Sequence, residues 1–196
     1  MQSKEILIIA LLLLAGAVAN YLCTLLFAAL SVPFEIEFII IAYCLVVMLL
    51  SPRLGPVICI GIIAAILNIV SDPTYGVTLA GGQLAMPEDL WLWGLFSFVS
   101  EPVGILVCSF SFAYLVAKAG RAAPLVSGFL ATVGSGFAYL IMAVLFASGQ
   151  VGTVAPWVTT FILTVLLVAV MNAVIIQVLY LVLEKPVRST VAGTAG

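Results

Sequence analysis

The chain has 196 residues, of which 65% are hydrophobic and only 7% are charged, and it contains no histidine. Its mean hydropathy of +1.40 and its long apolar runs exclude a soluble globular domain. Because lipid offers the backbone no hydrogen-bond partner, such runs predict helices that satisfy their own polar groups. The composition therefore predicts an all-α integral membrane protein.

Six transmembrane helices are expected, in chain order over residues 6–30, 34–50, 54–70, 90–117, 122–146 and 154–183, with proline or glycine in every connection. The first segment is too long for the apolar part of a signal peptide, so it predicts a retained span. The second and third helices are short, at about 17 residues each. Two short helices beside four long ones predict a recess on the outer side. The outer loop between the third and fourth helices, of about 19 residues, is long enough to act as a lid, and loops of this length without structure of their own are usually functional or disordered.

The basic residues set the expected topology. With the N-terminus inside, every cation of the chain falls on the cytoplasmic side: Lys4, Arg53, Lys118, Arg121, Lys185 and Arg188. A re-entrant hairpin in place of the second and third helices would carry Arg53 into the membrane, at a cost of roughly 2.5–3.5 kcal/mol. We therefore expect both termini in the cytoplasm and a multi-pass protein of the plasma (inner) membrane. Residues 1–188 form one transmembrane domain, and 189–196 form a flexible tail.

Catalysis is not expected. The chain has no histidine, no GxSxG elbow and no GxxxxGK[ST] loop, and its four cysteines lack metal-ligand or redox spacing. These absences predict no enzymatic activity, no metal site and no cofactor. Any ATP hydrolysis must come from another protein.

The fourth helix carries the most informative polar residues. Its spacing places one set on a single face: Trp93, Ser97, Ser100, Glu101 and Gly104. Glu101 lies about 15 Å below Trp91 along the helix, and Pro102 frees a backbone carbonyl one turn earlier. No basic residue lies within a span to pair with this carboxyl group. Glu101 either accepts a hydrogen bond from Asn or Ser of a neighbouring helix or meets a ligand or proton, and we favour a ligand role.

Other polar and aromatic residues extend this candidate site. Asn68 and Asp72 share one face of the third helix, although "SDP" is also a helix-stop signal. Tyr75, Trp91 and Trp93 either belong to the aromatic belt, as Trp157 does, or stack on a substrate ring. Asn20, Asn172 and Gln177 are expected to join helices by hydrogen bonds.

Small residues recur at helix-contact spacing. The first helix carries Ala15-x-x-x-Ala19, and the third and fifth helices carry similar sets that include Gly61 and Gly128. Such faces let helices approach closely, and the face on the first helix could equally receive another membrane protein.

Together these features resemble the substrate-binding (S) components of energy-coupling factor (ECF) transporters. The resemblance is carried by the chain length, the six spans with both ends inside, the Ala-x-x-x-Ala of the first helix and the stretch "PFEIEFIIIAYCLVVMLLSPRLGPVICIGIIAAIL". In that family a short second span likewise ends in a "GP"-type turn before a glycine-rich third span. The resemblance covers the whole chain at the level of architecture.

The resemblance implies a high-affinity binding subunit for uptake of a small vitamin-like solute. The solute would enter from outside, into a pocket formed by the outer halves of the fourth to sixth helices. A transmembrane coupling subunit and two cytoplasmic ATPases would energise transport, and Ala15 and Ala19 would face that partner. The chain lacks the histidines of the nickel and cobalt branch and of thiamine-type pockets. The acidic residues favour a neutral or cationic, ring-containing substrate. Two alternatives remain: a stand-alone proton- or cation-coupled transporter or channel, and a structural membrane scaffold.

Overall fold

The computed structural model describes residues 3–31, 36–72, 78–80, 83–85, 88–147 and 154–192. Its α-helices are α1 (Ser3–Ala29), α2 (Phe38–Leu50), α3 (Leu54–Ser71), α4 (Glu88–Ala119), α5 (Ala123–Phe146) and α6 (Val154–Ala192). The 3₁₀ turn η2 (Gly120–Ala122) joins α4 to α5, and β1 (Thr78–Ala80) pairs antiparallel with β2 (Gln83–Ala85). Apart from this small hairpin, the described fold is helical.

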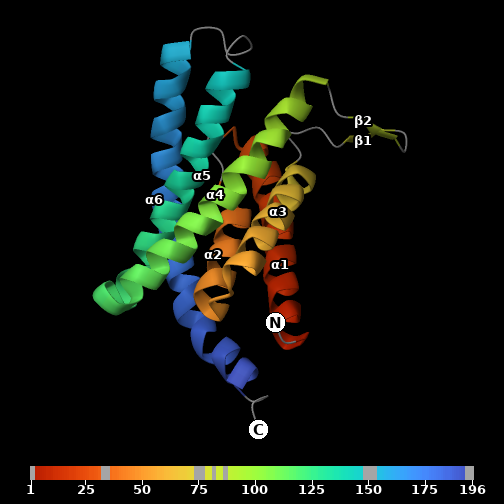
Figure 1. The fold of residues 1–196 in the computed structure, drawn as a ribbon. Coiled ribbons are helices and arrows are strands. Elements are labelled where there is room, and N and C mark those ends of the chain that lie inside the picture. Colours follow the sequence, from red (N-terminus) through yellow and green to blue (C-terminus); the bar gives the residue numbers. More distant parts are fainter. Residues whose placement is uncertain are drawn as a thin grey trace.

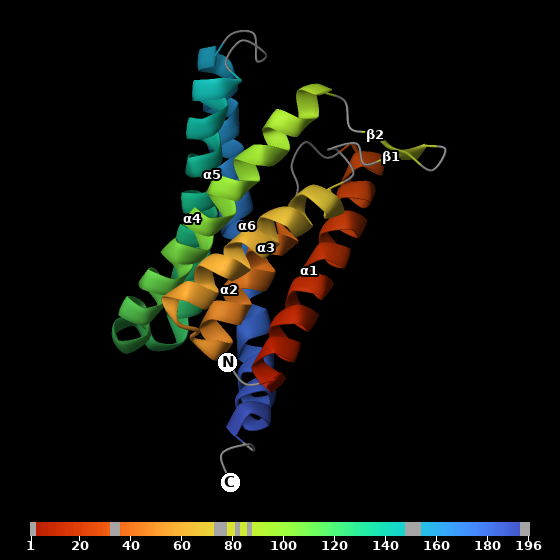
Figure 2. The same cartoon turned by 45° about the vertical axis from the view of Figure 1, so that its right-hand side comes forward.

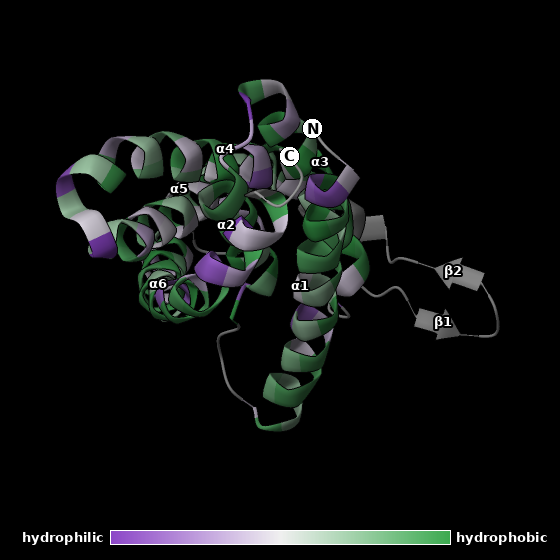
Figure 3. Cartoon of the chain, turned by 90° about the horizontal axis from the view of Figure 1, so that it is seen from below, coloured by the Kyte–Doolittle hydropathy of each residue, from purple (hydrophilic) through white to green (hydrophobic). Residues whose placement is uncertain are grey.

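The helices have the length and the apolar surface of a membrane protein. Among the described residues, four stretches are long and apolar enough to cross a membrane: Ser3–Ala29, Leu54–Ser71, Gly94–Phe146 and Ala155–Val191. The third of these stretches covers α4 from Gly94 onward and all of α5. The outward side chains of the four stretches stay apolar, with Leu11 57% and Leu163 63% exposed. Figure 3 shows hydrophobic residues along the length of the helices. This surface suits lipid and indicates a multi-pass membrane protein.

The helix α2 is the centre of the bundle. It contacts each of the other five helices, and every residue from Ile39 to Leu49 is buried. Its 13 residues span about 20 Å, against about 30 Å for the hydrocarbon core of a bilayer. The expected helix over 34–50 was too long within the described residues, because α2 begins at Phe38. At that point the Asn20 side chain accepts the Phe38 N–H at 3.2 Å and satisfies one of the amides left free at a helix start.

Two further regions differ from expectation: the connection between α3 and α4, and the C-terminal end of α6. The long loop contains the β1–β2 hairpin, which the sequence analysis did not identify. Residues 189–192 were assigned to a flexible tail but continue α6. There the hydroxyl groups of Ser189 and Thr190 donate to the Pro186 carbonyl at 2.9 and 2.8 Å. Residues 193–196 lie outside the described residues.

Small residues allow close helix packing, as the sequence predicted. A Cβ added at Gly61 of α3 would lie 2.9 Å from Cα of Pro102 on α4. A Cβ at Gly128 of α5 would lie 2.7 Å from Cδ1 of Ile176 on α6. At Gly61 the neighbouring atoms include the backbone of Pro102, so glycine is required there, whereas at Gly128 the end of the Ile176 side chain would have to move aside.

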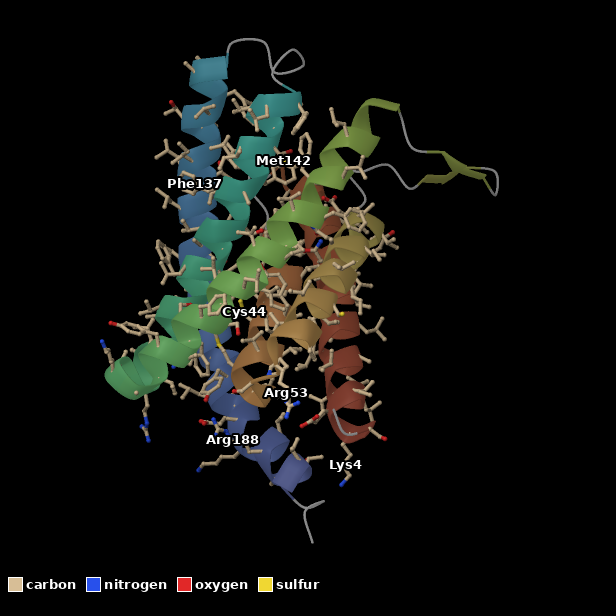
Figure 4. All side chains as sticks on the ribbon, viewed as in Figure 1. Lys4, Cys44, Arg53, Phe137, Met142 and Arg188 are labelled. Carbon is tan, nitrogen blue, oxygen red and sulfur yellow. The ribbon has the colours of Figure 1, made fainter. Side chains whose placement is uncertain are left out.

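The two chain ends lie at the same end of the bundle. Figures 1 and 2 show the N- and C-termini close together at the lower end, where α1 begins and α6 ends. Figure 4 places Lys4, Arg53 and Arg188 at this end as well. We call it the basic end.

Candidate functional site

The predicted polar stripe on α4 points into the bundle. Ser97, Ser100 and Glu101 are 0%, 2% and 2% exposed, and Gly104 is also buried. This confirms that the described members of the stripe share one buried face. Glu101 lies about 25 Å along the helix from Lys118, which lies in the last turn of α4. The carboxyl group is therefore deep in the bundle and far from the nearest cation on its own helix.

Glu101 meets a second predicted residue, Asn68 of α3. The Asn68 Nδ2 group donates to Glu101 Oε1 at 3.3 Å, and both side chains are buried. The other carboxyl oxygen, Oε2, has no hydrogen-bond partner among the described residues. The sequence left two alternatives for Glu101, a hydrogen bond from a neighbouring helix or contact with a ligand or proton. The hydrogen bond from Asn68 accounts for only one of the two carboxyl oxygens. A buried polar atom without a partner costs about 1–3 kcal/mol, and more when it is charged.

Tyr43 of α2 is a member of the site that sequence reasoning missed. It is completely buried, and its hydroxyl oxygen has no hydrogen-bond partner in the described part of the chain. A Cβ added at Gly104 would overlap this hydroxyl and would lie 2.9 Å from Ser135 Cβ of α5. The hydroxyl also approaches the Glu101 carboxyl group without reaching good hydrogen-bond geometry. The only sequence feature that could have identified Tyr43 is its polar hydroxyl group within the otherwise apolar residues of α2.

These residues form one buried acidic site, which we call the Glu101 cluster: Tyr43, Asn68, Ser97, Ser100 and Glu101. Three of its oxygens lack a partner among the described residues: Tyr43 Oη, Ser97 Oγ and Glu101 Oε2. Carboxylate oxygens only accept hydrogen bonds, whereas hydroxyl groups both donate and accept. The cluster can therefore receive N–H or O–H donors, or a proton on the carboxylate.

A second polar contact lies beside the cluster. Asn20 of α1 accepts the Phe38 N–H and donates from Nδ2 to Ser71 Oγ at 3.4 Å. Asp72 follows Ser71 at the end of α3, where its N–H donates to the Asn68 carbonyl at 3.0 Å. Asp72 is half-buried and ends the helix. The structure thus shows the helix-stop role that the sequence left open for this residue, and its role in substrate binding stays a prediction.

The other interhelical bonds join the second half of the bundle. Asn172 Nδ2 of α6 donates to Thr132 Oγ1 of α5 at 3.3 Å. Gln177 Oε1 accepts the Leu125 N–H at the start of α5, at 3.1 Å. Together with the bonds of Asn20, these contacts confirm that all three amides join helices.

Aromatic side chains from α4, α5 and α6 also pack together. Phe96 meets Tyr139 edge-on with 5.7 Å between ring centroids, and Tyr139 stacks on Phe161 at 6.0 Å and 7°. Trp157 packs on Phe161 at 5.4 Å. The sequence analysis assigned Trp157 to the membrane belt and did not identify the other three. These aromatic residues belong to three different helices, so no regular spacing in the sequence indicates that they are in contact. Their contact depends on how the helices pack.

Part of the predicted site cannot be placed. Tyr75 and the side chains of Trp91 and Trp93 lie outside the described residues. The expected open recess is also not seen at the Glu101 cluster, which is enclosed. One cavity lined by described residues lies at the basic end.

The predicted partner surface lies on the outside of α1. Ala15 is exposed and Ala19 half-buried, whereas Gly16 and Ala17 between them are buried. A Cβ at Gly16 would lie 2.5 Å from Ala42 Cβ, so this side of α1 packs on α2. Ala15 and Ala19 are therefore accessible at the bundle surface, and a partner there stays a prediction.

The cysteines and acidic residues offer no metal site in the described chain. All four cysteines are free thiols, of which Cys44 and Cys108 are buried. No group of three or more His, Cys, Asp or Glu side chains gathers in the described residues.

Comparison with protein families, with curated proteins and with solved structures gave no match. The functional reading therefore depends on the site itself.

Proposed function

We propose that this chain is the substrate-binding membrane subunit of an importer for a small vitamin-like solute. In this proposal α1 to α6 all cross the plasma membrane, the basic end faces the cytoplasm, and separate ATPase subunits supply the energy. The orientation follows from the positions of the six basic residues, because short cytoplasmic connections are enriched in Lys and Arg. The Glu101 cluster then lies in the half of the bundle that faces outward.

The observation that supports this function is the incomplete hydrogen bonding of the Glu101 cluster. Asn20 and Gln177 place their side chains against a defined partner. Asn172 Oδ1 and Ser127 Oγ lack a partner among the described residues, as do three oxygens of the Glu101 cluster. The cluster differs because it contains a carboxyl group, and the Tyr43 hydroxyl lies close to it. Ionisable groups inside a membrane bundle are costly and generally mark substrate or ion sites. A solute with N–H or O–H donors would supply partners for the Glu101 and Tyr43 oxygens.

One observation favours a second function, stand-alone coupled transport. Glu101 is 2% exposed and has no cationic side chain on its own helix within about 25 Å. An enclosed carboxyl group without a basic partner also suits a site that exchanges a proton for a cation. The two functions differ in whether this chain transports alone.

The first experiment is to purify the full chain in mild detergent and to identify any co-purified small molecule by mass spectrometry. The recovered compound is then titrated against the wild type, Glu101→Gln and Tyr43→Phe. We expect Glu101→Gln to weaken binding roughly tenfold or more, because it replaces one carboxyl oxygen by an amide N–H₂ group, which donates hydrogen bonds and does not accept them. Glu184→Gln is the matched control, since Glu184 is paired with Arg188 at the basic end.

The outcomes separate the functions. A recovered solute that binds Glu101→Gln as tightly as the wild type would refute the site. An empty protein that shows no thermal shift with a panel of vitamins would argue against the importer subunit. Uptake into vesicles that contain this chain alone would establish the stand-alone transporter instead.

A further inference from the structure

The turn between α4 and α5 carries two basic side chains. Lys118 lies in the last turn of α4 and Arg121 in η2, and both are exposed. Gly120 between them has a φ of +51°, and a Cβ placed there would meet nothing within 4 Å. Figures 1 and 2 show this turn toward the basic end, on the side of the bundle opposite α1. Both cations are therefore accessible from outside the bundle.

This turn has no acidic residue near it in the sequence, unlike other basic positions of the chain. Lys4 is followed by Glu5, and Arg188 forms an ion pair with Glu184 at 3.1 Å. From residue 102 to residue 183, in contrast, the chain contains no Asp or Glu. The two cations of the turn form no ion pair with any residue that the structure describes. Their positive charge is therefore left for a ligand.

The Lys118 ammonium group is held beside Tyr114, one turn earlier on α4. It lies 4.0 Å from the centre of the Tyr114 ring and donates a hydrogen bond to the Tyr114 hydroxyl. Because the phenol is neutral, this contact does not compensate the positive charge, and the ammonium group has two further N–H donors. The hydroxyl group accepts here and keeps its own proton for an acceptor. The ammonium and the hydroxyl are therefore neighbouring donors for one anion.

The outward face of α4 continues from Lys118 as an aromatic surface. Phe110, Tyr114 and Lys118 are four residues apart and so lie along one face of the helix. Phe110 is 64% and Tyr114 62% exposed, within the apolar stretch Gly94–Phe146. Phe110 lies about 12 Å along the helix from the cation. In a bilayer the headgroups lie at the level of the basic residue, and the acyl chains lie beside the two rings.

We propose that this surface binds an anionic phospholipid, such as phosphatidylglycerol. Lys118 and Tyr114 donate to the phosphodiester, and an acyl chain lies along Phe110. Arg121 adds a second positive charge at the headgroup level. Phosphatidylcholine carries an ammonium group as well as the phosphate, and residues 102–183 hold no acidic side chain to receive it. The surface therefore selects a headgroup with a net negative charge. This lipid site is independent of the proposed solute-binding function.

The test measures lipid selectivity on the full chain. Protein stripped of lipid in mild detergent is equilibrated with mixed micelles that hold equal amounts of phosphatidylglycerol and phosphatidylcholine. It is then re-isolated, and the retained lipids are quantified by mass spectrometry. We expect phosphatidylglycerol to be enriched roughly fivefold or more over phosphatidylcholine, the factor that one basic residue at a membrane surface contributes.

Two double variants assign the selectivity to the turn. Lys118→Gln with Arg121→Gln should retain the two lipids equally. Lys4→Gln with Lys185→Gln removes the same charge elsewhere and should keep the wild-type preference. Tyr114→Phe keeps the ring but loses the hydroxyl donor, so its preference should fall between those of the wild type and the first double variant. Because the four basic positions are exposed, their substitution should leave thermal unfolding unchanged.

The proposal is overturned if the wild type retains the two lipids in the offered ratio, or if both double variants lose the preference equally. The second result would assign it to the total charge of the protein. A further arm offers soluble glycerophosphoglycerol, which has the headgroup without acyl chains. Weak competition by this compound would support a site that also contacts the acyl chain. If it binds to the turn while phosphatidylglycerol is not enriched, the membrane lipid is the wrong ligand.

Discussion

Replacing Gly104 by alanine would place a methyl group against the Tyr43 hydroxyl. The added Cβ would overlap that oxygen and would lie 2.9 Å from Ser135 Cβ. Tyr43 is completely buried, so its ring has no free space into which to turn. Extra volume in a packed core costs about 1–3 kcal/mol. Alanine regains about 1 kcal/mol of helix propensity relative to glycine. The expected net loss of stability is therefore about 0–2 kcal/mol.

A double-mutant cycle separates the steric contact with the Tyr43 hydroxyl from the gain in helix propensity that alanine brings. Tyr43→Phe removes an oxygen that lacks a hydrogen bond to the described residues, so alone it should change stability by less than about 1 kcal/mol. In the double variant the new methyl group takes the place of that oxygen. The double variant should be more stable than Gly104→Ala by about 1–2 kcal/mol. Recovery should be partial, since the contact with Ser135 remains.

The assay is reversible unfolding in detergent micelles, where 1 kcal/mol corresponds to roughly 2–4 °C in Tm for a chain of this size. Gly55→Ala is the control, because a Cβ at Gly55 has nothing within 4 Å and brings no clash. Additive effects of Gly104→Ala and Tyr43→Phe would refute the placement of the hydroxyl beside Gly104.

Three further predictions concern the neighbouring contacts. Asn68→Ala removes the hydrogen-bond donor to Glu101 Oε1 and should lower the free energy of unfolding in the same micelles by about 1–3 kcal/mol. An unchanged free energy of unfolding would show that this hydrogen bond is not made. Asn20→Leu removes the acceptor of the Phe38 N–H and should speed hydrogen exchange of that amide, whereas unchanged exchange would contradict its capping role. Gly16→Ala places a Cβ 2.5 Å from a side chain of α2 and should lower Tm, and a Tm at or above wild type would show that α1 and α2 are less closely packed.

The sequence predicted most helix bounds because apolar runs and their proline and glycine ends are local features. The helix α3, expected over 54–70, spans Leu54–Ser71, and the helix expected over 122–146 spans Ala123–Phe146. The start of α2 was missed because it depends on Asn20, which lies 18 residues earlier. The hairpin was missed although the dipeptide Gly81-Gly82, which is typical of two-residue hairpin loops, separates its two strands in the sequence.

The site was predictable where a polar residue stands out in an apolar helix. Glu101, Ser97 and Ser100 share a helical spacing, so one helix was enough to place them on one face. Their contact with Asn68 joins residues 33 positions apart, and no local pattern specifies that register. Tyr43 was missed for a different reason. The helix α2 is buried on all sides, so its residues have no amphipathic pattern that would point the phenol toward a site.

The arrangement of α1, α2 and α3 explains how polar groups reach this depth. On α3, Asn68 and Ser71 are three residues apart and lie on one face. Asn68 bonds to Glu101, and Ser71 bonds to Asn20, which in turn accepts the first N–H of α2. The helix α2 is about 10 Å shorter than the hydrocarbon core of a bilayer. If its C-terminal end lies at one boundary of that core, its N-terminal end lies about 10 Å inside the other boundary. The hydrogen bonds of Asn68 and Ser71 form a continuous, buried polar row from Glu101 to the end of α3, away from the basic end. In the proposed binding function, this row would connect the end of α3 to the carboxyl group through hydrogen-bonding side chains.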